Sequence, residues 1–175
     1  VTYTYSDTIT YTITMYSVNT HGCNSDTIKK PFTVYPYPHV NAGPDKFVLE
    51  GGSVELESKT FANDPRYVWT PDLYLTDARI ARPRVMSPKT DMTYRLTLTG
   101  RGGCTVSDDV FVKLLKFPAI PNTFTPNNDG INDTWRIDYL NTYPSNRVQV
   151  FTRSGNLVFE SRGYNTPWDG TLKGK

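Results

Sequence analysis

The chain has few of the residue types on which most catalytic and metal sites depend. Among 175 residues there are two cysteines and two histidines, and neither His21 nor His39 has a second histidine or a cysteine at ligand spacing. The sequence contains no Gly-x-Ser-x-Gly elbow, no His-Glu-x-x-His motif, no phosphate loop and no glycine-rich nucleotide fingerprint. We therefore predict that this chain is not an enzyme, and we expect no cofactor apart from one calcium alternative given below.

Strong charge and long apolar runs are also missing. The formal net charge is +2 and the largest basic cluster is the pair Lys29 and Lys30, so we expect no nucleic-acid partner. No apolar run approaches the roughly 20 residues of a membrane helix, so we expect no membrane span. The residues after Val1 lack the basic start and apolar segment of a signal peptide. We interpret the sequence as the C-terminal piece of a longer protein.

Tyrosine and threonine, in contrast, are abundant. Twelve tyrosines and an aromatic share of 13% favour strands, because branched and aromatic side chains suit a half-buried pleated surface. Two segments about 80 residues apart, 11–36 and 94–118, also share a pattern of strand, glycine-containing turn with cysteine, second strand and proline exit. This spacing is the size of a small β-sandwich, so we predict an all-β chain with tandem sandwich repeats.

The second copy of the repeat is whole, whereas the first has only its last two or three strands. The second copy adds a strand at Val54 and a strand that contains Trp69, which we place in the core between the sheets. In its strand 94–98, alternate residues beginning with Tyr94 should share one face. We predict three units: part of a repeat at residues 1–37, a complete repeat at 38–117 and a smaller sandwich-like domain at 118–175.

The third unit begins with an unusual stretch. Residues 121–135 read PNTFTPNNDGINDTW, with two prolines, one glycine, four asparagines and two aspartates. This composition excludes a helix and favours turns, since Asn and Asp bond their own backbone and each proline holds its predecessor extended. Two further segments follow: VQVFTRSGNLVFE at 148–160, which predicts a hairpin with a basic turn, and PWDGT at 167–171 with Gly174 and Lys175.

These three segments, in this order, resemble the gliding-motility-associated C-terminal domain of Bacteroidetes, the type B sorting signal of the type IX secretion system. The resemblance covers roughly the last third of the chain. Family members continue beyond the Gly-Lys with a last aromatic-rich strand that begins near Pro-x-Gly-Thr-Tyr, whereas this sequence ends at Lys175. We therefore expect the sorting domain to lack its last strand here.

The resemblance implies a function and partners. The domain would be recognised by the type IX translocon and by an outer-membrane barrel protein of the PorP/SprF type, and its cargo would be a secreted, outer-membrane-associated surface protein such as a gliding adhesin. We expect the partner to contact the loop at 122–134 or an open sheet edge, the latter by strand addition. The residues assigned to partner recognition are Asn122, Phe124, Thr125, Pro126, Asn127, Asn128, Asp129, Gly130, Asn132, Asp133, Arg153, Gly155, Trp168, Asp169 and Gly170.

The repeats resemble the PKD-like and immunoglobulin-like repeats of long surface proteins of the same bacteria. In those repeats Trp-x-Pro, x-x-Pro and Thr-Tyr occur in this order, and this chain has the same order between Trp69 and Tyr94. The resemblance makes Tyr94 the corner tyrosine, whose hydroxyl bonds an upstream backbone group, and the repeats a stalk made semi-stiff by proline linkers at 35–38 and 117–121.

The two cysteines occupy equivalent turns of successive repeats. Equivalent points of tandem domains lie about 30–40 Å apart, beyond the roughly 7 Å Cα limit of a disulfide, so we expect no bridge between Cys23 and Cys104. In the resembling repeats this cysteine often pairs with one in the first strand, where this chain has Leu49. The resemblance thus predicts that Cys104 is a free and mostly buried thiol.

Alternatives remain at several positions. Asn127, Asp129 and Asp133 could wrap a calcium ion with their oxygens, or they could form Asx turns that cap backbone N–H groups, which we favour. Trp135 and Trp168 could form a sugar platform, but in so small a domain we favour a core role. A glycan-binding accessory module of a secreted polysaccharide-degrading enzyme is the alternative function. Asp64, Asp72 and Asp77 are interpreted as solvated turn residues.

Overall fold

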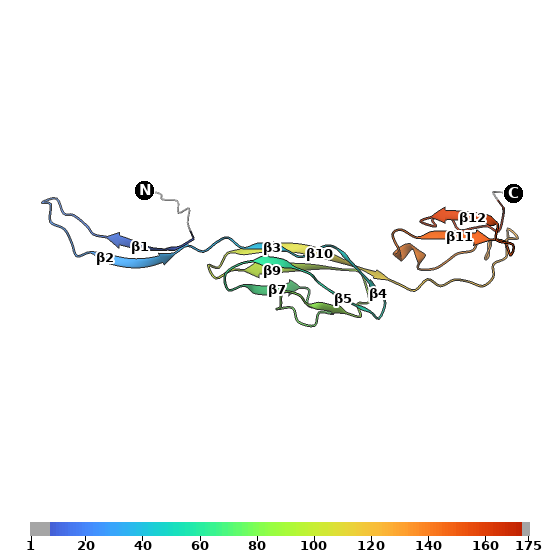
Figure 1. Ribbon diagram of the computed structural model, residues 1–175, viewed down its shortest axis with the longest axis horizontal. Helices are drawn as coiled ribbons and strands as arrows, with labels where there is room; N and C mark the ends of the chain where they lie inside the picture. Colours follow the sequence, from blue (N-terminus) through green and yellow to red (C-terminus); the bar gives the residue numbers. More distant parts are fainter. Residues whose placement is uncertain (1–7, 173–175) are drawn as a thin grey trace.

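The computed structural model describes residues 8–172, and this part of the chain is all-β, as predicted (Figure 1). Three units follow one another along the long axis: a hairpin, a central domain and a C-terminal unit (Figure 1). Within the described residues, no helix has the length and apolar character needed to cross a membrane. Gly174 and Lys175, part of the predicted late turn, lie outside the described residues.

The first unit is a single antiparallel hairpin of β1 (Thr10–Met15) and β2 (Ile28–Thr33). Its turn has the same backbone hydrogen bonds as the turn of the second repeat. The amide of Asn19 donates to Cys23 O and that of Gly22 to Asn19 O, at 3.0 and 3.1 Å. In the central domain Gly100 donates to Cys104 O and Gly103 to Gly100 O, at 3.0 and 2.9 Å. The two copies of the internal repeat therefore share the structure of this turn as well as their sequence pattern.

The central domain is built on a four-stranded sheet with two smaller strand pairs packed around the same core. The sheet has the order β4 (Lys46–Leu49), β10 (Thr105–Leu115), β9 (Met92–Thr99) and β7 (Arg66–Thr70), with β4 and β10 parallel and the other neighbours antiparallel. The pairs are β3 (His39–Asn41) with β6 (Lys59–Phe61) and β5 (Ser53–Glu55) with β8 (Arg84–Met86).

Strand β9 carries the predicted alternation into the core. Tyr94, Leu96 and Leu98 are fully buried, and Trp69 on the neighbouring strand is 1% exposed, so the predicted core positions are confirmed. The indole N–H of Trp69 donates to Ile80 O at 3.0 Å, which satisfies its polar atom. Period-two alternation places successive side chains on opposite faces of a strand, and burial of one face sets the register.

The hydroxyl of Tyr94 donates to the upstream carbonyl of Leu73 at 2.9 Å, as the corner-tyrosine resemblance implies. Burial, together with the nearby Tyr74, raises the pKa of Tyr94 from 10.0 to about 12. The folded state therefore favours the neutral phenol. This contribution to stability is complete below pH 10 and is lost as the pH rises through about 12.

Tyr94→Phe should consequently lower the free energy of unfolding by about 1 kcal/mol at neutral pH, since one hydrogen bond is lost and the Leu73 carbonyl remains without its donor. The difference from the native chain should shrink between pH 10 and about 12, because in this range the unfolded chain releases the Tyr94 proton while the folded chain keeps it. Urea unfolding at a series of pH values measures both effects. A difference that stays constant across this range would show that Tyr94 is not held neutral by the fold.

Both cysteines are free, and both are exposed. The prediction that Cys104 is mostly buried was therefore wrong. Cys104 closes the turn between β9 and β10, immediately before β10 begins, and a residue at that position projects from the tip of a hairpin rather than into the core. Its place in the turn was read correctly, but its burial was inferred from a resemblance in which a partner thiol lies nearby.

The C-terminal unit contains β11 (Arg147–Phe151), β12 (Leu157–Arg162) and one 3₁₀ turn, η1 (Leu140–Thr142). The strands form the predicted hairpin. Two isolated bridges join loop segments to each other: Ala119 pairs with Asp138 within the chain that precedes the hairpin, and Trp135 pairs with Trp168 in the chain that follows it. Because Ala119 exchanges two backbone hydrogen bonds with Asp138, the predicted proline linker at 117–121 is partly incorporated into this unit.

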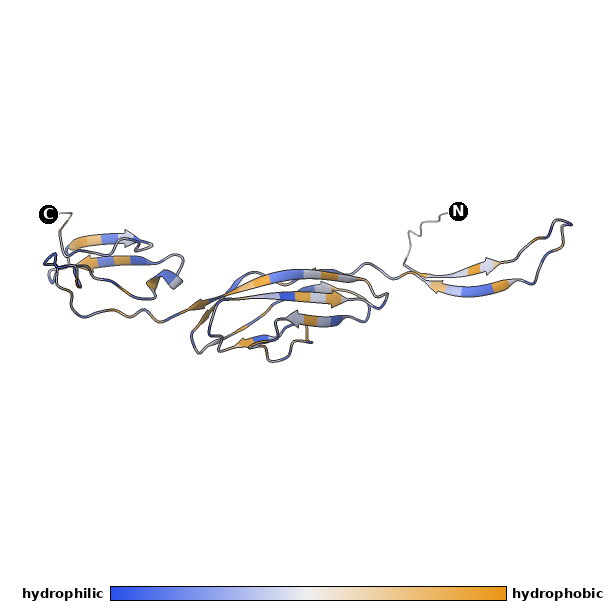
Figure 2. Ribbon diagram, turned by 180° about the vertical axis from the view of Figure 1, so that it is seen from behind, coloured by the Kyte–Doolittle hydropathy of each residue, from blue (hydrophilic) through white to orange (hydrophobic). Residues whose placement is uncertain are grey.

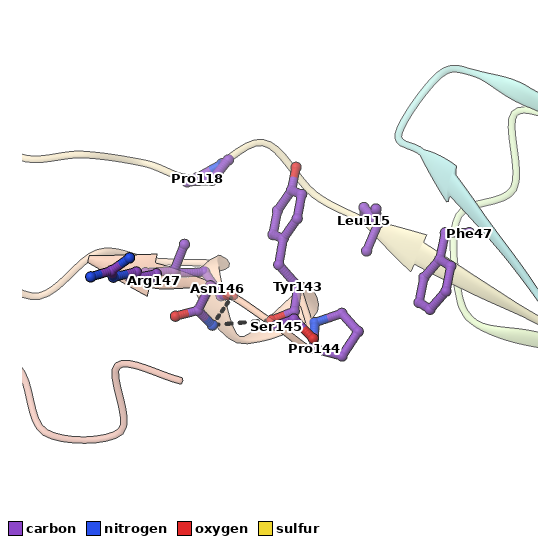
Figure 3. A pocket seen from close by; sticks show the side chains of 9 residues that line it. Phe47, Leu115, Pro118, Tyr143, Pro144, Ser145, Asn146 and Arg147 are labelled. Carbon is purple, nitrogen blue, oxygen red and sulfur yellow. Dashed lines mark hydrogen bonds between the residues drawn. The ribbon is translucent and has the colours of Figure 1, made fainter. Parts of the chain in front are cut away.

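The central domain and the C-terminal unit touch at a small joint. The amide of Lys116 donates to Thr142 Oγ1 at 3.2 Å, and its ammonium lies 5.0 Å from the ring centroid of Tyr139. Beside this contact is an open, largely apolar groove of about 680 Å³ (Figure 3), lined by Phe47, Leu115, Pro118, Leu140, Tyr143, Pro144, Ser145, Asn146 and Arg147. A contact this small leaves the two units with separate cores.

Candidate functional site

The loop at residues 122–134 is organised by one carboxylate. Oδ1 of Asp133 accepts hydrogen bonds from the amides of Asn127 and Asn128, at 3.1 and 2.7 Å, and Oδ2 accepts one from Gly130 at 2.8 Å. Three backbone donors that no strand or helix could satisfy are thereby paired within the loop. The loop also closes on itself, because the amide of Thr125 donates to Asn132 O at 2.8 Å.

Asp129 forms a second set of hydrogen bonds within the same loop. Its carboxylate accepts from the Asn127 side-chain amide at 2.9 Å and from the Ile131 amide at 2.8 Å. These two bonds lower the pKa of Asp129 below its usual value, because they favour the charged form. Asn128, Gly130 and Asn132 adopt positive φ of 60°, 84° and 56°. Glycine and asparagine tolerate this geometry best. Together with the hydrogen bonds from backbone amides to the Asn and Asp side chains, these turns form the Asx-turn network that we favoured.

Calcium binding by Asn127, Asp129 and Asp133 stays a prediction. Among the described residues no group of three His, Cys, Asp or Glu side chains is placed to hold a metal ion, so a calcium site here would depend on amide and backbone oxygens as well. If the ion binds, the melting temperature of chelator-treated protein should rise on adding millimolar Ca²⁺. At a calcium concentration of 100 times Kd, the free energy of unfolding should increase by about 2.7 kcal/mol. Asp129→Asn should remove the shift, and an unchanged melting temperature in the native chain would reject the ion.

The late turn is ordered in a similar way. The indole N–H of Trp168 donates to Thr171 O at 2.8 Å. Oδ1 of Asp169 accepts from the hydroxyl and the amide of Thr171, at 2.7 and 3.0 Å, and these bonds lower the pKa of Asp169. Gly170 between them has φ of 85°, which strongly favours glycine.

The loop and the late turn form one structure, although they are more than 40 positions apart in the sequence. A Cβ on Gly170 would lie 3.2 Å from Phe124 Cζ and 3.3 Å from Pro126 Cγ, so a side chain at this position would require these neighbours to shift. The rings of Phe124 and Trp168 have centroids 5.6 Å apart. The amide of Trp135 donates to Trp168 O at 2.7 Å. The predicted recognition residues of these two segments are therefore brought together.

Tyr164 is a structural position of this unit that the sequence analysis missed. It is 8% exposed and lies between the hairpin and the late turn. Its hydroxyl donates to Trp135 O and accepts from the Trp168 amide, and its ring meets Phe159 edge-on at 6.1 Å. Burial raises the pKa of Tyr164, so the neutral hydroxyl is the form that holds the two segments. The aromatic residue after Gly163, between two recognised motifs, was the signal available in the sequence.

The turn of the hairpin stands apart from this structure. Arg153 and Gly155 are exposed in the turn between β11 and β12, where Thr152 donates to Asn156 O at 2.8 Å. Figure 1 places this turn at the end of the unit that points away from the central domain, near the chain terminus. In the described part of the chain, no hydrogen bond joins it to the loop.

Most of the predicted recognition residues are accessible. Phe124, Asp133 and Trp168 are half-buried, and the rest are exposed: Asn122, Thr125, Pro126, Asn127, Asn128, Asp129, Gly130, Asn132, Arg153, Gly155, Asp169 and Gly170. Trp135 and Trp168 are half-buried with their indole N–H groups bonded to Pro121 O and Thr171 O, which agrees with a core role better than with a sugar platform.

The family that matches this chain covers the same C-terminal unit. Residues 118–175 match the model of the CHU_C type IX secretion signal domain. No curated protein matches the chain. The match begins at the residue that we predicted as the boundary, and it includes the loop, the hairpin and the late turn. Residues 118–175 of this chain are therefore a type IX secretion signal domain of the CHU_C family.

Proposed function

We propose that the C-terminal unit directs this protein through the type IX system by presenting the joined loop and late turn to the translocon. The matched family is a secretion signal domain, which implies that the protein is secreted or located at the cell surface. The observation that supports the recognition surface is the contact of Phe124 with both Gly170 and Trp168, which holds two sequence-distant motifs together as one feature. A rigid surface loses little conformational entropy on binding.

We further propose an outer-membrane barrel protein of the PorP/SprF type as the partner, and strand addition as one mode of contact. The β11–β12 sheet has two strands, so each has an outer edge that is not paired within the sheet. An extended segment of a partner can pair with such an edge through backbone hydrogen bonds. The hairpin and the central domain would act as the stalk of an adhesin-like protein, and their end-to-end arrangement supports this role (Figure 1).

The export assay tests the proposal directly. A signal peptide and a fluorescent reporter are fused to residues 40–175 and expressed in a gliding host with a type IX system. Reporter should reach the surface or the medium, and removal of residues 118–175 should reduce the exported fraction to that of a strain without the translocon. Equal export with and without these residues would contradict the sorting function.

A further inference from the structure

The loop at residues 122–134 holds one large aliphatic side chain, Ile131, at the molecular surface. Ile131 is 72% exposed, the highest fraction among the large hydrophobic side chains in the described part of the chain. In Figure 2 the strands β11 and β12 carry hydrophobic bands, whereas the loops beside the chain terminus are mostly hydrophilic. A single exposed aliphatic residue is common in soluble proteins and needs no function by itself. The surroundings of Ile131 distinguish it from such a residue.

The backbone of Ile131 is held on both sides. Its amide donates to Oδ1 of Asp129 at 2.8 Å, and its carbonyl accepts from the hydroxyl of Thr125 at 3.4 Å. The neighbours Gly130 and Asn132 have φ of 84° and 56°, so the chain turns sharply before and after this position. The isoleucine side chain is therefore presented to solvent from a fixed frame.

The structure of the loop does not require an isoleucine here. The carboxylates of Asp129 and Asp133 bond the amides of the loop, while the aliphatic side chain of Ile131 is left in solvent. Residues favoured in such turns are Gly, Asn, Asp and Ser, because they bond the backbone or tolerate positive φ. Loop stability thus leaves the isoleucine unexplained, whereas burial of its apolar surface against another molecule would be favourable.

We infer that Ile131 is the apolar anchor of the recognition surface, and that it inserts into an apolar pocket of the protein that receives the sorting domain. The inference rests on the proposed sorting function and names the residue that contributes most to the contact. Interface affinity is concentrated in a few side chains that fill well-packed, desolvated pockets. A side chain on a fixed backbone loses little conformational entropy when it fills such a pocket.

Two β-branched substitutions of similar shape, Ile131→Val and Ile131→Thr, test the anchor in the export assay. Valine keeps an apolar side chain, whereas threonine brings a hydroxyl that an apolar pocket leaves without a partner. At equal protein abundance, the exported fraction of the Val variant should stay within about fourfold of the native chain. That of the Thr variant should be at least about fivefold below the Val variant. Hydrogen exchange of β11 and β12 should be the same in both, because the side chain is exposed in the free protein.

Ile120→Val and Ile120→Thr are the matched controls, since Ile120 is 61% exposed in the same unit but lies outside the loop. These two variants should be exported alike. Equal export of the two Ile131 variants, in a chain that still needs residues 118–175 for export, would overturn the anchor and leave the sorting function intact. A Val–Thr difference of the same size at Ile120, or altered exchange in Ile131→Thr, would also overturn it. Export that does not depend on residues 118–175 would contradict the sorting function and the anchor together.

Discussion

Replacement of Trp168 by alanine is expected to abolish export and to unfold the C-terminal unit. The indole contacts the rings of Phe124 and Phe159, with centroids 5.6 and 6.2 Å away, and donates to Thr171 O. Removing a large aromatic side chain costs about 3 kcal/mol or more when it is packed in this way. A unit of this size has a total stability of roughly 3–9 kcal/mol, so between about a third and all of it would be lost.

Export of the reporter fusion and hydrogen exchange of β11 and β12 measure the two consequences of Trp168→Ala. Arg153→Ala serves as the matched variant, since Arg153 is exposed in the hairpin turn and its removal should leave the exchange pattern unchanged. Loss of export with Arg153→Ala, in a folded unit, would place the turn within the recognised surface. Undiminished export of an unfolded Trp168→Ala unit would show that the translocon reads a linear sequence, and the proposed recognition surface would fail.

The second large effect is expected at Trp69, in the other core. Trp69→Ala removes a side chain that is 1% exposed and leaves the carbonyl of Ile80 without its donor, so the central domain should lose about 3–5 kcal/mol. The C-terminal unit should keep its stability, because its core shares no residue with that of Trp69 and the joint at Lys116 is small. Residue-resolved hydrogen exchange in the full chain separates the two units.

This pair of tryptophans gives a reciprocal test of where the signal lies. Trp69→Ala should leave the exported fraction of the reporter near that of the native chain, whereas Trp168→Ala should abolish it. Protein abundance in the cell has to be measured alongside, since an unfolded central domain is exposed to proteases. If both substitutions block export equally at equal abundance, the signal includes the central domain and is larger than residues 118–175.

The strands could be predicted because their information is local. The alternation of Tyr94, Leu96 and Leu98 with polar neighbours has the period of a strand, and only one register buries all three. The loop network was equally readable, since Asn and Asp bond backbone groups two to six positions away. The family resemblance depended on the same local segments and was confirmed over residues 118–175.

The errors and omissions concern burial and contacts between distant segments. Cys104 was expected to be mostly buried because of a resemblance, but burial depends on how the whole hairpin sits against its neighbours, and the turn projects outward. Tyr164 was overlooked because a lone aromatic residue in a loop has no periodicity. Its role appears only when the backbone of Trp135 and that of Trp168 meet at its hydroxyl.

The sequence by itself determined the all-β class, the repeat, the central core and the identity of the sorting unit, because each of these depends on the order and spacing of nearby residues. The tertiary structure alone decided that Gly170 lies against Phe124 and that the loop and the late turn form one surface. These features arise from the packing of segments tens of residues apart, where the path of the whole chain sets which side chains meet.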